Sequence, residues 1–533
     1  MNQLYYGDNL PVLREHIADE SVDLIYLDPP FNSKRDYNLL FKSPKGQDSE
    51  AQVEAFKDSW QWGLQAQTEF SELLKQKNSE VSKLVNALVE FLGHNDMTAY
   101  LVMMASRLLE LHRVLKPAGS LYLHCDPTAS HYLKVVLDAV FGKANMRNEI
   151  VWRRSHPKGL AFTRFANNHD VILAYGKDRS ATTWNPIYTQ HDMAKAAEQY
   201  RLTDPDGRRY QLTSLLNPNP DRPNLTYEFK GVTKVWRWTR SRMMEADTQG
   251  LIVVPKGGEG IPRFKRYLDE QEGIPVSDFW DDIEMASGAE SLGYPTQKPL
   301  ALLERIIEAS SNKGDVVLDP FCGCGTAVHA AQKLKRKWIG VDITHLAISL
   351  IEKRLKDAFK SRCDFEVYGT PKDLDAARDL ASRDKYQFQY WAVSLVDAQP
   401  SQNRKKGPDG GVDGIKFFQD VDRVGARKII VSVKGGGLKA DDVRALNHVR
   451  ERESAEIALF ISLENPTKGM LADAASAGFF TSAAGKNFPR VQLLTIDGLL
   501  SGKQRAEHPD HQPDLNFKKA KAEANAQQHT MPL

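Results

Sequence analysis

The sequence predicts an α/β protein with a mainly parallel sheet in a large domain, followed by a smaller α/β domain. Short β-branched apolar runs alternate with helical patterns over residues 1–177 and again over 291–369. A segment rich in Pro, Asn, Gly and Arg, 178–290, interrupts this alternation. A separate alternating pattern covers 385–503, so we expect this part to fold on its own.

The composition of the 533-residue chain is typical of a globular protein with two to four domains, at 41% hydrophobic and 26% charged residues. With no long apolar run and no basic-flanked N-terminal one, we expect no membrane association and a bacterial or phage cytoplasmic location. Cys125, Cys322, Cys324 and Cys363 form neither a disulfide framework nor a paired zinc motif. The net charge of +2 is uninformative, since a nucleic-acid-binding protein need only be basic locally.

The first strand of the large domain, expected at 21–27, ends at Asp28-Pro29-Pro30-Phe31. The two prolines lack N–H groups, so they end the strand and hold a rigid turn. An acid, a backbone carbonyl and an aromatic ring then stand at the carboxyl end of a strand, where α/β sheets bind ligands. This set suits a planar ring with an exocyclic amine. The alternative is a simple strand-ending turn.

The following elements continue the alternation. Apolar residues at helical spacing predict a helix over 98–115, which ends at the basic, proline-containing stretch after it. A strand is expected at 120–125 and a helix at 131–141. Two further strands are expected at 149–152 and 171–175. Strands and helices in this order are typical of one parallel sheet.

The segment 178–290 interleaves aromatic and basic side chains over 227–242. Basic groups neutralise phosphates, and aromatic rings stack on bases or wedge between them. We therefore expect DNA contacts from five residues here: Lys234, Trp236, Arg237, Arg240 and Arg242. The alternative is a small β-rich insertion whose tryptophans form its own core.

The second half of the sheet contains a strand–turn–helix–strand unit. A helix at 300–310 precedes a strand at 315–318, a glycine-containing turn at 319–326, a helix at 327–334 and a strand at 338–342. A further helix is expected at 343–359. This arrangement indicates a nucleotide-type binding site.

The residues of this turn favour a particular cofactor. Gly323 and Gly325 let a ligand approach the backbone, and Asp342 is placed to bind two ribose hydroxyls. Asp319, directly before the turn, disfavours a pyrophosphate and suits the positively charged methionine end of S-adenosylmethionine. We take the turn's two cysteines as small packing residues, because no second Cys/His pair completes a zinc site. The candidate cofactor-binding residues are Lys298, Asp319, Phe321, Gly323, Gly325, Thr326 and Asp342.

These motifs together resemble a known family. Asp28-Pro29-Pro30-Phe31, the stretches at 148–152 and 295–299, and the turn at 319–326 resemble the amino-methylating DNA methyltransferases. Their order is similar to the β class, which includes type III modification subunits, and the resemblance covers about residues 1–365. It implies a Rossmann-like methyltransferase fold and S-adenosylmethionine as donor. It also implies double-stranded DNA as substrate, a homodimer, and a target recognition domain at 178–290.

The resemblance also implies a mechanism and a target. The base must leave the stack, and Asp28 and the Pro29 carbonyl then accept hydrogen bonds from its exocyclic amine while Phe31 stacks on the ring. Methyl transfer itself needs no metal. An acid at the first motif position resembles adenine-N6 enzymes, whereas cytosine-N4 enzymes of this class usually have Ser or Thr there. Phe31 replaces the commoner Tyr. We expect an adenine target, with cytosine-N4 as the alternative.

The C-terminal part is expected to begin after a linker at 370–384 and to end before a disordered tail at 504–533. Asp413 and Lys434 match positions of the Mrr-like PD-(D/E)xK nucleases, but Ser432 stands where a second acid or amide is expected. In that family these positions bind a divalent ion such as Mg²⁺. The pattern leaves open whether this domain cleaves DNA or is a degenerate nuclease fold kept for DNA binding or assembly.

Three other functions remain as alternatives. A methyltransferase for RNA or protein glutamine usually has the cofactor turn before the proline-rich motif, the reverse of the order here. A non-catalytic DNA-binding protein with a relic fold would not need Asp28 and Asp342. The Gly-x-Gly-x-x-Gly of a dehydrogenase is absent. The sequence leaves open the recognition site and whether the chain works with a restriction subunit or alone.

Overall fold

The computed structural model describes residues 1–30, 36–42, 48–57, 62–76, 79–157, 165–190, 193–255, 257, 260–288, 290–294, 296–401, 411–421, 426–509 and 520–523. The chain forms two compact units. One comprises Met1–Asn185 with Asp278–Leu533, and the other is Pro186–Ser277. Among the described residues, no helix has the length and apolar character needed to cross a lipid bilayer.

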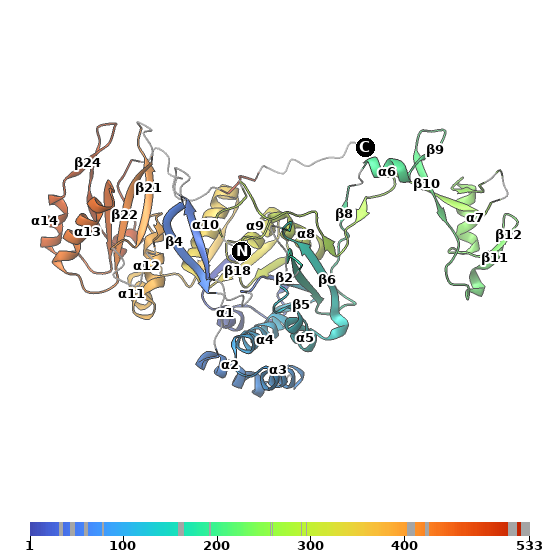
Figure 1. Cartoon of the computed structure of the whole chain (residues 1–533), viewed down its shortest axis with the longest axis horizontal. Helices are drawn as coiled ribbons and strands as arrows, with labels where there is room; N and C mark the ends of the chain where they lie inside the picture. The colour runs from blue at the N-terminus through green and yellow to red at the C-terminus, as the bar shows by residue number, and fades with distance from the viewer. Residues whose placement is uncertain are drawn as a thin grey trace. The chain divides into compact units, whose positions relative to one another are not determined.

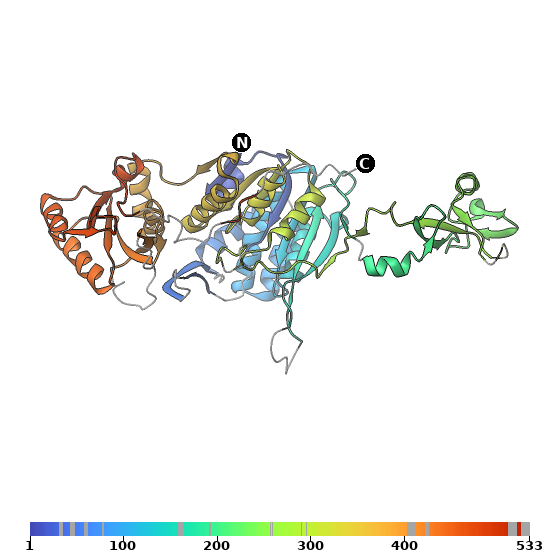
Figure 2. The same ribbon diagram turned by 90° about the horizontal axis from the view of Figure 1, so that it is seen from above.

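The first unit contains a nine-stranded sheet with the order β16-β6-β7-β5-β2-β17-β18-β1-β19. Figure 2 shows strands of this sheet side by side, seen from above. Strand β7 runs antiparallel to both of its neighbours, and the other pairs are parallel. The α/β class predicted from the sequence is confirmed. The strands are β1 (Asn2–Tyr6), β2 (Val22–Leu27), β5 (Leu115–Cys125), β6 (Met146–Arg153), β7 (His169–Gly176), β16 (Phe279–Trp280), β17 (Val316–Asp319), β18 (Lys337–Asp342) and β19 (Phe365–Tyr368).

Helices cover both faces of this sheet (Figure 1). One face carries α1 (Asn9–His16), α2 (Leu64–Lys75), α3 (Ser79–Leu92), α4 (Asp96–Val114) and α5 (Ser130–Phe141). The other face carries α8 (Leu300–Ser310), α9 (Thr326–Lys333) and α10 (His345–Phe359). A separate hairpin pairs β3 (Asp36–Lys42) with β4 (Asp48–Lys57).

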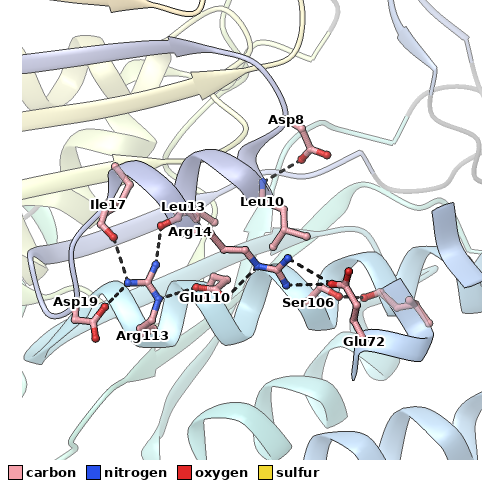
Figure 3. Close-up of polar contacts among 11 residues, drawn as sticks. Asp8, Leu10, Leu13, Arg14, Ile17, Asp19, Glu72, Ser106, Glu110 and Arg113 are labelled. Atoms are coloured by element: carbon pink, nitrogen blue, oxygen red, sulfur yellow. Dashed lines mark hydrogen bonds and ion pairs between the residues drawn. The ribbon is translucent and has the colours of Figure 1, made fainter. Parts of the chain in front are cut away.

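Helix α1 is fixed between β1 and α4 by polar contacts at both of its ends (Figure 3). The Asp8 side chain caps its start by accepting a hydrogen bond from Leu10 N at 3.0 Å. Arg113 of α4 donates to the carbonyls of Leu13 and Ile17 at 2.6 and 3.2 Å, near its end. A cation that binds the last carbonyls stabilises a helix C-terminus, so the short helix has a fixed position next to the sheet.

The second unit, Pro186–Ser277, is shorter at both ends than the insert predicted at 178–290. Its core contains Leu215, Phe229, Trp236, Met243 and Ile252. Its elements are β8 (Tyr188–Thr189), α6 (Met193–Gln199), β9 (Leu202–Thr203), β10 (Arg209–Ser214), β11 (Thr226–Phe229), β12 (Val232–Val235), α7 (Arg240–Thr248), β13 (Ile252–Val253), β14 (Arg263–Tyr267) and β15 (Ile274–Pro275).

Both ends of the predicted insert belong instead to the nine-stranded unit. After the insert, Phe279 and Trp280 add the edge strand β16 beside β6. Trp152 of β6 is buried and donates its Nε1–H to the Ile283 carbonyl at 2.9 Å. Before the insert, Asn185 N donates to the Ala309 carbonyl of α8 at 2.7 Å. A two-residue edge strand lacks a periodic signal, which is why the sequence did not indicate it.

The C-terminal part has a five-stranded sheet of order β20-β21-β22-β23-β26, with apolar cores on both faces. In β22, Ile429, Val431 and Val433 face one core and Ile430 faces the other. Its elements are α11 (Leu374–Arg383), α12 (Lys385–Ser394), β20 (Gln399–Pro400), β21 (Gly414–Gln419), β22 (Ala426–Lys434), α13 (Ala440–Arg452), β23 (Ile457–Ser462), α14 (Lys468–Ser476), β24 (Phe479–Thr481), β25 (Asn487–Pro489), β26 (Val491–Thr495) and α15 (Ile496–Leu500).

The prediction of a linker at 370–384 is wrong for most of that segment. Residues 374–383 form α11, whose first turn is capped by the Asp373 side chain. Ala377, Leu380 and Ala381 recur at helical spacing and are buried in the core of the C-terminal domain. The domain therefore begins about one helix earlier than predicted.

The prediction of a disordered tail at 504–533 is also wrong for the described residues of that segment, 504–509 and 520–523. The Gln504 side chain accepts a hydrogen bond from Thr495 N at 2.7 Å. Glu523 contacts the large domain: its backbone N–H donates to the Ala358 carbonyl at 3.0 Å, and its carboxylate lies 3.0 Å from His329 Nε2. Polar composition alone did not reveal these contacts.

Candidate active site

Three acids lie together at one edge of the nine-stranded sheet. Strand β2 pairs in parallel with β17, and β17 pairs in parallel with β18. Asp28 directly follows β2, while Asp319 and Asp342 are the last residues of β17 and β18. Because the carboxyl ends of parallel strands meet at one edge, the structure brings these three acids into one site.

The segment Asp28-Pro29-Pro30 contacts the motif at 295–299, far away in the sequence. Lys298 Nζ donates a hydrogen bond to Asp28 Oδ2, and the lysine is buried, at 8% exposure. Pro29 is also buried. The predicted stacking residue, Phe31, lies outside the described residues. Lys298 was predicted to bind the cofactor. In the structure it instead forms an ion pair with Asp28, the acid predicted to be catalytic.

The backbone around Lys298 is held on both sides. The Gln297 side chain accepts from Leu292 N at 2.8 Å and donates to the Glu290 carbonyl at 2.8 Å. On the other side, α8 begins at Leu300, whose N–H donates to Glu290 Oε1 at 2.5 Å. The lysine therefore projects from a fixed turn.

The turn at 319–326 has the close backbone geometry that its glycines predict. Gly325 N donates to the Cys322 carbonyl at 2.7 Å, and α9 begins at Thr326. Gly323 and Gly325 have φ values of 48° and 74°, which favour glycine. A Cβ at Gly325 would lie 2.7 Å from Cγ1 of Ile351. Alanine would not fit at this position without a shift.

Two carboxylates lie at this turn, Asp319, which is buried, and Asp342, which is half-buried. Asp342 Oδ2 accepts from Gly323 N at 2.9 Å, and Oδ1 accepts from the Thr344 N–H and hydroxyl, both at 2.9 Å. Burial raises the pKa of Asp342 to about 6, against the hydrogen bonds that lower it. Asp319 Oδ1 accepts from Phe321 N at 3.0 Å. Burial, with the charges of Asp28 and Asp342 beside it, also raises the pKa of Asp319 well above its usual range.

The chemistry of this donor set fits a cationic ligand with hydroxyl groups. Buried carboxylates with raised pKa values gain most from a positive charge or from O–H donors. A carboxylate oxygen accepts about two hydrogen bonds, so Oδ2 of Asp342, which accepts only the Gly323 N–H among the contacts described, can accept a further donor. The residues present therefore fit S-adenosylmethionine, which has a ribose and a charged methionine moiety.

Sequence reasoning missed Arg354, a buried arginine beneath the glycine turn. Its Nη1 donates to the Cys324 carbonyl and to Thr326 Oγ1, each at 3.1 Å, and its Nε donates to His329 Nδ1 at 3.1 Å. Burial lowers the pKa of Arg354. The available signal was an arginine on the apolar face of a helical pattern, next to Ile351.

Sequence reasoning also missed a hydrogen-bonded group of three buried side chains, which starts from Tyr26 on β2, the strand that leads to Asp28. The Tyr26 hydroxyl is 3.0 Å from His124 Nδ1, and His124 Nε2 is 3.1 Å from Asp170 Oδ2. Burial opposes ionisation of Asp170, but the hydrogen bond with His124 still holds its pKa below the ordinary value. Burial raises the pKa of Tyr26 well above its usual range. A histidine within an apolar strand was the signal.

The residues predicted to contact DNA in the insert divide into two groups. Lys234, Arg237, Arg240 and Arg242 are exposed. The prediction for Trp236 is wrong, because its side chain is fully buried in the core of this unit and its Nε1–H donates to the Tyr227 carbonyl at 2.9 Å. Trp236 therefore follows the alternative of an internal core.

In the C-terminal domain, Asp413 accepts hydrogen bonds from protein donors. Its Oδ2 accepts from Val433 N at 2.6 Å and from the Ser432 hydroxyl at 3.4 Å, and its Oδ1 accepts from Gln389 Nε2 at 3.2 Å. Lys434 lies 3.6 Å from Asp442. Within the described ranges, no three His, Cys, Asp or Glu residues are grouped so as to hold a metal ion. Of the three predicted nuclease-like residues, only Asp413 offers a carboxylate for Mg²⁺, and its oxygens already accept the three hydrogen bonds given above.

Comparison with known proteins identifies the family. The profile of the family described as "DNA methylase" matches residues 22–353, more than half of the chain. The chain belongs to the DNA methylase family. The resemblance inferred from the four motifs is confirmed, and the family match includes both Asp28 and Asp342. The C-terminal residues 380–500 match the profile described as "Restriction endonuclease", which confirms the second resemblance.

Individual relatives are modification enzymes. The chain is 35% identical to the type II methyltransferase M.EcaI of Enterobacter cloacae, over 48% of this chain and 57% of that protein. It is 25% identical to the type III restriction-modification enzyme StyLTI Mod subunit of Salmonella typhimurium (63% and 50%). It is 26% identical to the DNA adenine methyltransferase YhdJ of Escherichia coli (66% and 82%). The chain thus spans about half the length of the first two relatives.

Proposed function

We propose that this chain is a site-specific DNA methyltransferase that transfers a methyl group from S-adenosylmethionine to N6 of adenine. The observation that supports it most is the position of Asp28 beside the 319–326 turn, at neighbouring strand ends of one sheet. Family membership supports methyl transfer to DNA. The adenine relative supports the proposed base.

The cofactor would be held by residues of the second half of the sheet. S-adenosylmethionine would supply an electrophilic methyl group on its sulfonium. Asp342 would accept from the ribose through Oδ2, and Asp319 would face the ammonium of the methionine moiety. The open backbone at Gly323 and Gly325 permits close approach, and Phe321 and Thr326 flank it. Arg354 would hold the turn in shape from below.

The target base would be bound by residues of the first half. An adenine within a duplex cannot reach an enclosed site, so it must leave the stack, which costs a few kcal/mol. The Asp28 carboxylate and the Pro29 carbonyl would accept from the two N–H groups of N6. These hydrogen bonds orient the nitrogen lone pair towards the donor, and Phe31 would stack on the ring. Alignment of this kind is a large contribution to rate.

The choice of adenine depends on the first residue of the motif. A carboxylate accepts strongly from an amine, and aspartate at this position resembles adenine-N6 enzymes. The alternative is cytosine N4, whose amine offers the same two donors.

DNA would be contacted by the exposed cations of the insert, Lys234, Arg237, Arg240 and Arg242. Cations at these positions would neutralise phosphates of double-stranded DNA. A relative named as a type III modification subunit supports a role beside a restriction subunit, and a homodimer is expected from the family.

The C-terminal domain is proposed to act without magnesium-dependent cleavage. Ser432 replaces the second acid, and donors from Gln389, Ser432 and Val433 already bind Asp413. A domain of this kind would bind DNA or support assembly. Magnesium-dependent cleavage of unmodified DNA by the full chain, lost in Asp413→Ala, would contradict this part.

The experiment is methylation of plasmid DNA with the full chain, followed by hydrolysis to nucleosides. N6-methyladenine is the expected product, and N4-methylcytosine without N6-methyladenine would contradict the choice of base. Asp28→Ala should abolish transfer and leave S-adenosylmethionine binding measurable by calorimetry. Absence of binding heat in the wild-type chain would favour the relic fold instead.

A further inference from the structure

Lys298 lies where the two halves of the proposed site meet. Its ammonium donates to Asp28 Oδ2, although 270 residues separate the two in the chain. Lysine is rarely this buried unless it is paired. The fixed turn around Gln297 and the start of α8 hold its backbone. The contact between Lys298 and Asp28 is therefore formed by a side chain whose backbone has a fixed position.

The positive charge of Lys298 also acts on acids beyond Asp28. Burial raises the pKa of Asp319, and the Lys298 charge offsets part of that rise. The same charge contributes to the lowered pKa of Asp170. These acids surround the end of β2. One ammonium therefore offsets negative charge on both sides of the motif that would receive the base.

We propose that Lys298 is a positioning residue for Asp28 rather than a ligand of the cofactor, an inference that rests on the proposed function. Its ammonium binds Oδ2 and directs Oδ1 towards the N–H group of the target amine. A charge-assisted hydrogen bond fixes a carboxylate more firmly than a neutral one does. Lys298 thus prepares the acceptor on which alignment of the amine depends.

The chain offers a matched control on the same strand. Lys116 Nζ donates to both oxygens of Asp23, at 2.8 Å each, near the start of β2. Asp23 also accepts from Val316 N at 2.9 Å, so this pair connects β2, β5 and β17. Lys116→Met removes a lysine–aspartate pair from β2 at the opposite end from the site. It should leave methyl transfer unchanged.

The test compares Lys298→Met, Lys298→Arg and Lys116→Met in the full chain with the wild type. Calorimetry gives the Kd for S-adenosylmethionine, and radiolabelled methyl transfer to plasmid DNA gives kcat at saturating cofactor. For Lys298→Met we expect kcat to fall about 100-fold, as for a misplaced catalytic group, and Kd to stay within about threefold. Lys298→Arg keeps the charge and should recover at least about tenfold of the loss.

Each result is decisive. A Kd raised more than about tenfold, with kcat nearly unchanged, would make Lys298 a cofactor ligand and overturn the inference. Unchanged kcat and Kd in Lys298→Met would overturn it too, and so would a loss in Lys116→Met of equal size. Thermal unfolding shows whether Lys298→Met folds. If it does not fold, Lys298→Arg is the test, and a kcat below that of the wild type with an unchanged Kd for S-adenosylmethionine supports the inference. A wild-type chain without any transfer to DNA would refute the proposed function and this inference together.

Discussion

Alanine at Gly325 should destabilise the nine-stranded unit by two separate effects. The φ of 74° costs a residue with a Cβ about 1–2 kcal/mol. The new Cβ would lie 2.7 Å from Cγ1 of the buried Ile351, and such overpacking costs about 1–3 kcal/mol more. We expect a total loss of about 2–5 kcal/mol in the free energy of unfolding.

Gly314 separates the two effects. Its φ is 89°, but a Cβ there would have no atom within 4 Å. Gly314→Ala should therefore lose only the conformational part, about 1–2 kcal/mol. The assay is native-state hydrogen exchange of the β17 and β18 amides in the full chain, because a multidomain protein has no single unfolding free energy.

A double mutant tests the contact itself. Ile351→Ala alone should cost about 2–5 kcal/mol by leaving a cavity. Combined with Gly325→Ala, it removes the atoms that clash, so the two losses should sum to about 1–3 kcal/mol more than the measured loss of the double mutant. Equal losses in Gly325→Ala and Gly314→Ala, together with simple additivity in the double mutant, would refute the reasoning from close approach.

Three further predictions follow from the site and the insert. Because burial raises the pKa of Asp342 to about 6, cofactor affinity should fall about fourfold between pH 7.5 and 5.5 as the carboxylate becomes protonated, a dependence absent in Asp342→Asn. The same raised pKa means that protonation over this range stabilises the folded state, so a fall in affinity measured by calorimetry would not reflect unfolding. Trp236→Ala should remove about 3–5 kcal/mol from the insert and accelerate hydrogen exchange within Pro186–Ser277; unchanged exchange would contradict its core position. Arg242→Ala should weaken DNA binding and reduce the slope of log affinity against log salt by about 0.9, whereas an unchanged slope would exclude a phosphate contact.

The sequence predicted the central sheet well because its signals are local. β-branched runs gave β2, β17 and β18 nearly to the residue, and glycines with positive φ follow directly from the turn at 319–326. The order of the motifs predicts that Asp28 and Asp342 share one site. Each of these signals lies within a short window.

What the sequence could not indicate depends on packing between distant segments. Trp236 and Arg242 belong to the same aromatic and basic stretch of the sequence. Only the structure shows that the Trp236 ring is buried in a core and that the Arg242 side chain is exposed. The contact between Lys298 and Asp28 depends on two loops meeting at one sheet edge. The helix α11 was overlooked because its charged residues outnumber its three buried apolar ones.

The segment Pro186–Ser277 leaves and rejoins the sheet at two sites that belong to the scaffold. Before it, Asn185 is bonded to α8, and after it, Phe279 and Trp280 extend the sheet edge. A compact segment whose two ends are fixed in this way can be replaced by the corresponding segment of another methyltransferase. Chimeras with borders at 185 and 278 would test the proposal that this segment recognises the target. On that proposal they take the sequence preference of the donor enzyme and keep the chemistry of the host.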